Sequence, residues 1–538
     1  MTDLDAQAVE TVNCTIDGIE ITVPKGTRIL DAAAQAGIDI PHYCYHPGLS
    51  APAQCRMCLV EVEKAPKLIP SCVGTVTEGN VILTQSETAL KAREAVLEFY
   101  LVNHPLDCPV CDQSGECKLQ DYVALEGPAM GRLREPKRII GRDDFGGDVL
   151  YEGDRCILCT RCVRFMREVA QDESLAVVQR GHRGVIDTFF EEGLGGNIWA
   201  DNVIDICPVG ALVSKDFLHK ARAWDLDRVP SVCPNCTQGC NVRLEVRDNE
   251  VMRIKPRPNP EVNDHWMCDY GRLNYSWINR GNRIEAPLLR EGDRFVPVSW
   301  AEALTALVER MQAADGEAHA VVSPFMANED LGALRRVMET RGSAGGVYRV
   351  EEAEEVVLPG FPTLALREER AANVRGAELL GYTRVGSAEA RGGIEEAAAH
   401  AGPLFVLGDE LRDAPVDFGV RSALFVYIGH FLSPAARNAH VVLPATTFAE
   451  MEGSFTNVQR RVQRFWPALR APAMARPAWQ ILGVLHAGIT GGEATGTPAE
   501  AFAALGALRP EFAAVDWDAL GTQGISLAEP LALAGSAE

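Results

Sequence analysis

The first stretch of the chain alternates apolar and polar residues, and this pattern predicts a β-hairpin. Apolar side chains recur at every second position through residues 12–16 and again through residues 19–23, with Asp17-Gly18 between the two runs as a tight turn. Cys14 falls on the apolar face of the first strand. We therefore expect Cys14 to be a small core residue and not a metal ligand.

Helical periodicity follows the hairpin. Thr27 is placed to cap a helix through residues 29–34, and Gly37 is placed to end it. Residues 86–103 carry apolar side chains at helical spacing, with Ser86 as the expected N-cap. Pro105 is expected to end this second helix, which leaves His104 near its end.

The second half of the chain has the pattern of an α/β region. Short apolar runs, which predict buried strands, occur at residues 319–322, 404–407, 424–428 and 441–443, and helical stretches lie at residues 299–313 and 330–340. Strands that alternate with helices predict a parallel sheet covered by helices. Near the end, Thr497, Pro498 and Glu500 form the T-x-x-E pattern of a helix N-terminus.

Sixteen cysteines change this picture, because all of them lie within the first 268 residues. With His104, fifteen of them divide into four sets of four: Cys44, Cys55, Cys58 and Cys72; His104, Cys108, Cys111 and Cys117; Cys156, Cys159, Cys162 and Cys207; Cys233, Cys236, Cys240 and Cys268. A chain of 538 residues can build large cores and needs no disulfide framework. The grouping therefore favours metal centres in a reducing compartment.

Composition and charge argue against several classes of protein. The formal net charge of -22 and the pI near 5.0 disfavour a nucleic-acid surface. The N-terminus has the features of neither a secretory signal nor a transit peptide, and no apolar run approaches the roughly 18 to 20 residues of a membrane span. We expect a soluble chain that meets a membrane only through partner subunits.

The second set packs one imidazole and three thiols into residues 104–117, where Pro105, Pro109 and Gly115 turn the chain. Such a loop can wrap one metal centre. Three cysteines with one histidine are also a common structural zinc site, so these residues alone leave zinc and an iron–sulfur cluster both open.

The first set carries the most specific resemblance. A hairpin, a helix and then a cysteine loop is the order of a β-grasp ferredoxin, but ten residues separate Cys44 from Cys55, which departs from plant-type ferredoxins. With this spacing the chain resembles the G-subunit family of bacterial NADH-quinone oxidoreductase, respiratory complex I. The resemblance implies a [2Fe-2S] cluster on the first set and a [4Fe-4S] cluster on the second, with His104 as a ligand. A neutral imidazole in place of a thiolate would raise the potential of that cluster.

The third set looks like a bacterial two-cluster ferredoxin with one half erased. Cys156, Cys159 and Cys162 keep the C-x2-C-x2-C run, and Cys207-Pro208 keeps the distant ligand. The positions of the other four ligands are occupied by Met166, Asn197, Ala200 and Val203. One [4Fe-4S] cluster is therefore implied, which separates the chain from formate dehydrogenase α chains and iron-only hydrogenases.

The fourth set has the spacing C-x2-C-x3-C with a distant Cys268. Residues 242–246 alternate as a strand after its third cysteine, and Asp248-Asn249 is a turn. The set is similar to the [4Fe-4S] domain of molybdopterin oxidoreductases, and spacing alone leaves a zinc ribbon open. Some G-subunit relatives lack these cysteines. We therefore expect a cluster on the fourth set to be a side branch of the electron path or an evolutionary relic.

The cysteine-free half resembles a shortened molybdopterin oxidoreductase. Residues 438–457 are similar to the closing α/β unit of that family, yet only roughly 170 residues separate them from Cys268. No cysteine follows Cys268, Ser323 reads as a loop hydroxyl, and Gln459-Arg460-Arg461 departs from the usual Gly-Arg pair. The interpretation is a degenerate scaffold without molybdopterin.

The resemblance covers residues 9–282 with high specificity and the rest more loosely. It implies a multidomain α+β and α/β protein: a [2Fe-2S] ferredoxin-like domain (9–95), a [4Fe-4S] domain with one histidine and three cysteine ligands (96–136), a ferredoxin-like [4Fe-4S] domain (137–225), a molybdopterin-oxidoreductase-type [4Fe-4S] domain (226–282) and a degenerate α/β domain (283–538).

The implied function is electron transfer from a flavin-bearing, NADH-binding partner subunit toward quinone, in a complex that translocates protons. The expected place is the cytoplasmic side of the bacterial inner membrane, beside other peripheral-arm subunits. No G-x-G-x-x-G motif follows a strand, so we expect no NADH site and no catalytic residue in this chain. The rival interpretations are a formate dehydrogenase α chain, an NAD-linked hydrogenase diaphorase subunit and a zinc-stabilised scaffold.

Overall fold

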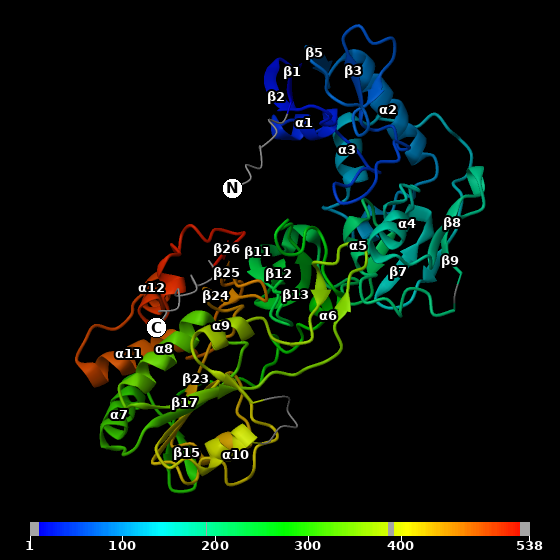
Figure 1. Ribbon diagram of the computed structural model, residues 1–538. Helices are drawn as coiled ribbons and strands as arrows, with labels where there is room; N and C mark the ends of the chain where they lie inside the picture. The colour runs from blue at the N-terminus through cyan, green and yellow to red at the C-terminus, as the bar shows by residue number, and fades with distance from the viewer. Residues whose placement is uncertain (1–9, 190, 386–391, 528–538) are drawn as a thin grey trace. The chain divides into compact units, whose positions relative to one another are not determined.

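The computed structural model describes residues 10–189, 191–385 and 392–527, and the chain divides into two compact units, one ending at Asp225 and one beginning at Leu226 (Figure 1). Each unit has its own sheets and its own buried core. The first unit contains the first three ligand sets, and the second unit contains the fourth set and the cysteine-free half.

The predicted hairpin is the start of a five-stranded sheet in the first unit. The strand order is β2-β1-β5-β3-β4, with β1 at Thr11–Ile16, β2 at Ile19–Pro24, β3 at Leu59–Val62, β4 at Ile69–Pro70 and β5 at Asn80–Leu83. Asp17 and Gly18 turn the chain with φ values of 47° and 86°, as a tight hairpin requires. Cys14 is 4% exposed, packed in the core of this sheet.

Two helices follow strands of this sheet, and an N-cap residue was predicted for each. Helix α1 spans Ile29–Gln35, but its N-cap is Arg28; the prediction of Thr27 was wrong, because its hydroxyl instead donates to the Pro24 carbonyl at 2.6 Å. Helix α2 spans Glu87–Leu101, and the Ser86 side chain accepts the predicted hydrogen bond, from the N–H of Ala89 at 3.2 Å. Gly37, with φ of 76°, follows α1 as expected.

The rest of the first unit consists of short elements joined by turns. Strands β6 (Arg142–Asp144), β7 (Val149–Glu152) and β10 (Leu212–Ser214) form one sheet, and β8 (Leu175–Val178) pairs with β9 (Val185–Thr188). The helices are α3 (Lys118–Glu126), α4 (Arg161–Phe165), a π-helical turn at Met166–Ala170, and α5 (Asn202–Ile206), with 3-10 turns at Cys108–Val110, Gly153–Arg155, Gly181–Arg183 and Ala223–Asp225.

The second unit begins with a three-stranded antiparallel sheet. It contains β11 (Asp227–Val232), β12 (Asn241–Arg247) and β13 (Glu250–Pro256), followed by helix α6 (Asp269–Leu273). The predicted turn is present, because Asp248 and Asn249 have φ values of 52° and 65°. A register shift between Glu245 and Val246 explains why the apolar alternation breaks in β13.

An eight-stranded sheet forms the centre of the second unit, in the order β15-β14-β23-β22-β21-β16-β17-β20. Its strands are β14 (Leu288–Glu291), β15 (Arg294–Pro297), β16 (Ala318–Val322), β17 (Ser343–Tyr348), β20 (Thr383–Arg384), β21 (Pro403–Leu407), β22 (Leu424–Gly429) and β23 (Val441–Pro444). The strands from β23 to β20 are parallel, as predicted, and β14 and β15 are antiparallel.

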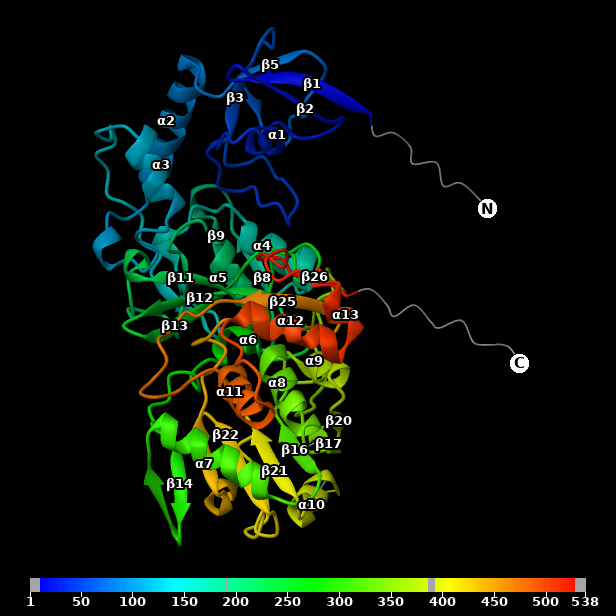
Figure 2. The ribbon, with the colours of Figure 1, turned by 90° about the vertical axis from the view of Figure 1, so that its left-hand side faces the viewer.

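Helices cover both faces of this sheet (Figures 1 and 2). Phe405 and Leu407 of β21 pack into a core with helices α7 (Trp300–Ala313), α8 (Asn328–Glu339) and α11 (Ala478–Thr490), whereas Leu404 and Val406 pack into a core with α10 (Gly392–Ala399). Burial on both faces explains the continuous apolar runs.

The remaining elements of the second unit are short strands and helices. They are α9 (Val374–Leu379), α12 (Pro498–Leu508), α13 (Pro510–Ala513), β18 (Val356–Val357), β19 (Ala365–Leu366), β24 (Gly453–Thr456), β25 (Arg461–Phe465) and β26 (Ile525–Ser526). Thr497 caps α12 as predicted, but Glu500 accepts from the N–H of Gly496.

Candidate metal centres

The first ligand set is buried in the loop between α1 and β3 and in the segment after β4. The four cysteine residues are at most 4% exposed. Hydrogen bonding from the thiols of Cys55 and Cys72 lowers the pKa of Cys44 to about 2, and that from Cys72 lowers the pKa of Cys58 to about 7. These mutual contacts join all four thiols, so the structure brings the predicted set together.

The second set lies in the loop between α2 and α3. Cys111 and Cys117 are buried, and burial, with small additions from Cys111 and Cys108, raises the pKa of Cys117 to about 11. Gly115 has φ of 87°, and a Cβ there would lie 2.5 Å from the Trp224 ring, so only glycine fits. The loop therefore has a fixed backbone conformation at Gly115, between Cys111 and Cys117.

His104 has the properties of a ligand in this loop. Its Nδ1 atom is buried and has no hydrogen-bond partner. Burial lowers the pKa of the imidazole to about 4, so the ring is neutral at pH 7 and has a lone pair for a metal. The neighbouring Arg155 guanidinium pairs with Asp107 at 2.6 Å and fixes the same loop.

The third set lines a small cavity. Cys156, Cys159, Cys162 and Cys207 all face it, together with apolar residues that include Ile186 and Leu212. Burial raises the pKa of Cys156, Cys159 and Cys207 to about 11 each. Three of the four residues at the erased ligand positions are packed as core, with Met166 and Val203 fully buried and Ala200 2% exposed, and the half-buried Asn197 donates to Asp172 at 2.8 Å. Three of these positions therefore serve the packing of the core.

The fourth set lies around the start of α6. Its cysteines are 4–5% exposed, and the N–H of Cys233 donates to the carbonyl of Cys240 at 2.9 Å. A Cβ on Gly271 would lie 3.0 Å from the Cys233 sulfur and 3.4 Å from the Cys268 sulfur. These two sulfurs therefore meet at one glycine, although 35 positions separate their residues in the chain.

The chemistry of the four donor sets fits iron–sulfur clusters. Burial penalises a free thiolate, as the raised pKa of Cys233, about 12, shows, and bound iron would supply the compensating positive charge. In residues 10–189, 191–385 and 392–527, no three His, Cys, Asp or Glu side chains meet the geometry of a site for a single metal ion.

Contacts link the second and third sets directly. A Cβ on Gly210 would lie 2.3 Å from the Cys111 sulfur, and Gly210 is three residues after Cys207. The N–H of Lys118 also donates to the carbonyl of Pro208 at 3.0 Å. Loops that carry ligands of two sets are therefore in van der Waals contact.

Three tyrosines lie close to cysteines of these sets. The Tyr43 ring centroid is 5.3 Å from that of Tyr100 and 5.4 Å from that of Tyr122. The pKa of Tyr100 is raised, mainly by burial and then by the charges of Cys55 and Cys159, which belong to different sets. The sequence analysis did not predict the position of these tyrosines or the Gly210 contact, because neither depends on a local spacing of residues.

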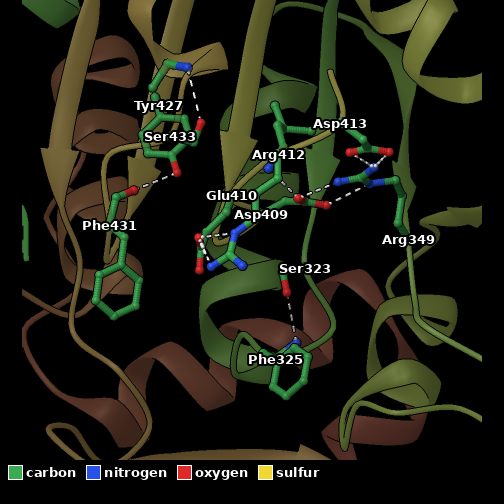
Figure 3. A network of polar contacts seen from close by, with 12 residues as sticks. Ser323, Phe325, Arg349, Asp409, Glu410, Arg412, Asp413, Tyr427, Phe431 and Ser433 are labelled. Atoms are coloured by element: carbon green, nitrogen blue, oxygen red, sulfur yellow. Dashed lines mark hydrogen bonds and ion pairs between the residues drawn. The ribbon is translucent and has the colours of Figure 1, made fainter. Parts of the chain in front are cut away.

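The cysteine-free half has a cleft at the carboxyl edge of its sheet, with a volume of about 480 Å³ (Figure 3). Ser323, Gly408 and His430 line it, just after β16, β21 and β22. The order of the strands reverses between β16 and β21, which is where ligands of α/β sheets commonly bind.

Polar contacts lie in and beside this cleft, which is lined by Glu410 and Arg412 but not by Arg349. Figure 3 shows Arg349 bonded to Asp409 and Asp413, and Arg412 bonded to Glu410. The hydroxyl of Ser323 accepts from the N–H of Phe325 at 3.3 Å, which is the behaviour of a loop hydroxyl.

The altered tail residues are also tied into the fold. Arg461 donates to the carbonyls of Gln523 and Gly524, at 3.3 and 2.7 Å. Arg460 has φ of 58° and lies 3.6 Å from the carboxylate of Glu511.

Family models match the chain in the order of these sets. They are a 2Fe-2S iron-sulfur cluster binding domain (9–87), an NADH-ubiquinone oxidoreductase-G iron-sulfur binding region (93–128), an NADH-quinone oxidoreductase subunit 3 ferredoxin-like domain (146–213), a molybdopterin oxidoreductase Fe4S4 domain (226–280) and molybdopterin oxidoreductase (283–356 and 369–487). Domains that bind [2Fe-2S] and [4Fe-4S] clusters are therefore present.

One relative decides the family. The 78 kDa subunit of mitochondrial NADH-ubiquinone oxidoreductase from Candida albicans is 32% identical over 597 aligned positions, which cover 88% of this chain and 82% of that protein. The chain belongs to the G-subunit, or 75 kDa, family of NADH-quinone oxidoreductase. The predicted family and fold class are thereby confirmed.

Other members of the G-subunit family are more similar over a shorter stretch. The NADH-quinone oxidoreductase G-subunit of Rickettsia felis is 40% identical over 62% of this chain and 49% of that protein, and the 75 kDa subunit of Reclinomonas americana is 44% identical over 56% and 43%. The chain thus spans about half the length of these relatives. Among the described residues, no helix has the length and apolar character needed to cross a bilayer.

Proposed function

We propose that the chain is the iron–sulfur electron-transfer subunit of an NADH-quinone oxidoreductase, with one cluster on each ligand set. The first set would hold a [2Fe-2S] cluster, and the second, third and fourth sets would each hold a [4Fe-4S] cluster. The observation that supports this function best is the contact between the second and third sets, where Gly210 meets the Cys111 sulfur. Electron transfer needs carriers that lie close together, whereas structural zinc sites have no need to lie close to one another.

When bound, the clusters supply one-electron carriers whose ligands need not move. The protein's own residues bury the ligands, exclude water and fix the loops. The neutral imidazole of His104 would replace a thiolate, and its lack of charge favours the reduced state of the second site. Arg155 and Asp107 hold the loop that carries this imidazole.

The fourth set lies in the other compact unit, and we assign it a side branch of the electron path. The cysteine-free half is proposed to carry no molybdopterin. No cysteine is available there, and Ser323 is occupied as a turn hydroxyl. Its place in the function would be that of a scaffold for assembly.

The proposed partners follow from the family. They are a flavoprotein subunit that binds NADH, other subunits of the peripheral arm, and quinone indirectly, with proton translocation in the whole complex. The acidic chain is not proposed to bind nucleic acid. The proposed place is the cytoplasmic face of a bacterial inner membrane, where this chain would be peripheral.

Reduction by NADH in the presence and absence of the flavoprotein tests this function. Dithionite should reduce the clusters of the purified chain, whereas NADH should do so only after the flavoprotein is added. Reduction of the isolated chain by NADH alone would contradict the proposed division of labour. Absence of any dithionite-reducible cluster signal would contradict the electron-transfer function itself.

A further inference from the structure

Two buried arginines lie where the first and third ligand sets meet. Arg161 and Arg164 belong to α4, on either side of Cys162, and are 9% and 4% exposed. Arg161 donates to the carbonyl of Ile206 at 3.1 Å and to that of Tyr45. These two acceptors are the direct chain neighbours of one ligand in the third set and one in the first.

Arg164 contacts ligand residues of both sets through a single guanidinium group. It donates to the carbonyl of Cys44, in the first set, and to that of Cys159, in the third set, at 3.4 Å. It also donates to the carbonyl of Ser50 and to the hydroxyl of Thr160 at 3.3 Å. One positive charge is therefore held between the two sets.

No carboxylate among the described residues forms an ion pair with either arginine. All their hydrogen bonds go to carbonyl and hydroxyl oxygens. The carboxylate of Glu168 lies on the other side of Ser50, where it accepts from the N–H and the hydroxyl of that residue at 2.9 and 2.6 Å. A buried cation without a directly bonded anion is costly, and neither arginine has such an anion among the described residues. Four thiolate ligands make each cluster a net anion, and reduction adds a further negative charge.

We propose that Arg161 and Arg164 form a shared positive centre that raises the reduction potentials of the clusters on the first and third sets together. This inference rests on the proposed function, because it requires both clusters. A charge in a buried, low-dielectric region acts strongly on both neighbours, whereas an exposed charge is screened. Arriving electrons would thus be stabilised at two successive carriers by the same residues.

The competing explanation is that the arginines only clamp two loops. A clamp would depend on the shape and hydrogen bonds of the guanidinium, whereas the proposed role depends on its charge. Arg164→Gln removes the charge, and Arg164→Lys keeps it while losing the planar fork. The two variants therefore separate charge from shape.

The experiment is a redox titration of the full chain followed by low-temperature EPR. In Arg164→Gln, the ratio of reduced to oxidised cluster at a fixed potential should fall at least tenfold for the signals of both the first and third sets, a shift of about 59 mV for a one-electron couple. Arg161→Gln should move the same two signals in the same direction. In Arg164→Lys, both ratios should stay within about threefold of the wild type, which is under half that shift on the same scale.

Arg167 supplies a matched control in the adjoining helical turn. Its side chain is 64% exposed and lies 3.9 Å from Glu168, so Arg167→Gln makes the same charge change in solvent and should leave both midpoints in place. The signal of the fourth set, whose ligands belong to the other compact unit, is an internal reference.

Several results would overturn the inference. They are unchanged midpoints in both Gln variants, a shift in only one of the two signals, an equal shift in all signals, and an equal effect of Arg164→Lys and Arg164→Gln. If a Gln variant fails to assemble the two clusters, Arg164→Lys should restore them, and its failure to do so would leave the clamp as the explanation. Absence of cluster signals in the wild type would instead refute the proposed function.

Discussion

The N–H of Lys118 donates a 3.0 Å hydrogen bond to the carbonyl of Pro208. Lys118 directly follows Cys117, and Pro208 directly follows Cys207, so the bond joins the residues next to the last ligand of the second set and the last ligand of the third set. This bond explains how two sets that are far apart in sequence form adjoining sites. Small substitutions in the loop after Cys207 should therefore affect the second and third sites.

The first prediction concerns Gly210 in that loop. In Gly210→Ala, the added Cβ would lie 2.3 Å from the Cys111 sulfur and 3.1 Å from the Cβ of Gln113, so a ligand loop must move. We expect a changed EPR line shape for the cluster on the second set, with at most a smaller change for the third. Gly196→Ala is the control, because its Cβ would meet no atom within 4 Å. Identical spectra for the two variants would contradict the contact.

The second prediction concerns the imidazole ligand. His104→Cys should keep a cluster, because a thiolate can also bind iron, but should lower its midpoint potential by adding a negative charge. His104→Ala has no ligand atom and should lose or convert that cluster. A midpoint that is unchanged or higher in His104→Cys would show that His104 does not bind the cluster.

The third prediction concerns a buried carboxyl group in the cysteine-free half. Glu329 of α8 accepts from the N–H and the hydroxyl of Ser454, at 2.9 and 2.6 Å. Burial raises its pKa from 4.5 to about 8, so the folded state binds a proton that the unfolded state releases. The contribution of this bound proton to the stability of the folded state is complete below pH 4.5 and is lost as the pH rises toward 8.

Glu329→Gln keeps the shape of this side chain without its titration. The free energy of unfolding should therefore depend less steeply on pH between about 4.5 and 8, by up to about 1.4 kcal/mol per pH unit. Anaerobic urea titrations at several pH values measure this slope. Glu339→Gln, at the far end of α8 with a half-exposed side chain, should leave the slope as it is. If the pH dependence of the unfolding free energy in Glu329→Gln equals that of the wild type, Glu329 does not take up a proton on folding.

The fourth prediction concerns molybdenum. The purified chain should release no molybdopterin, contain no molybdenum or tungsten, and show no cluster reduction by formate. Ser323→Ala should change none of these properties, because its hydroxyl is a turn acceptor. Elemental analysis and anaerobic spectra with formate make the test. Stoichiometric molybdopterin would favour the formate dehydrogenase interpretation.

Local features of this fold were predictable, because their causes lie within a few residues. The Asp17-Gly18 turn, the Ser86 cap and the all-buried strand at residues 404–407 follow from turn chemistry, capping and apolar runs. The Thr27 cap failed by one residue, since Arg28 is the N-cap and the Thr27 hydroxyl is engaged with Pro24.

Contacts between distant segments were not predictable in this way. The four ligand sets stay a prediction from cysteine spacing, and that spacing did not indicate which sets adjoin. Arg164 meets the carbonyl of Cys44 across 120 positions, and Lys118 meets Pro208 across the intervening domain. Such pairings depend on the packing of whole domains, and the C-x2-C spacing carries no information about them.

The most direct test of the central claim is a metal and sulfide count combined with low-temperature EPR of the dithionite-reduced chain, purified without oxygen. Four clusters predict about fourteen iron atoms per chain, zinc near zero, one [2Fe-2S] signal and [4Fe-4S] signals from the other sets. One tightly bound zinc and about ten irons would remove the cluster on the fourth set. A chain that binds zinc at several sets, with little iron and no EPR signal, would contradict the electron-transfer account.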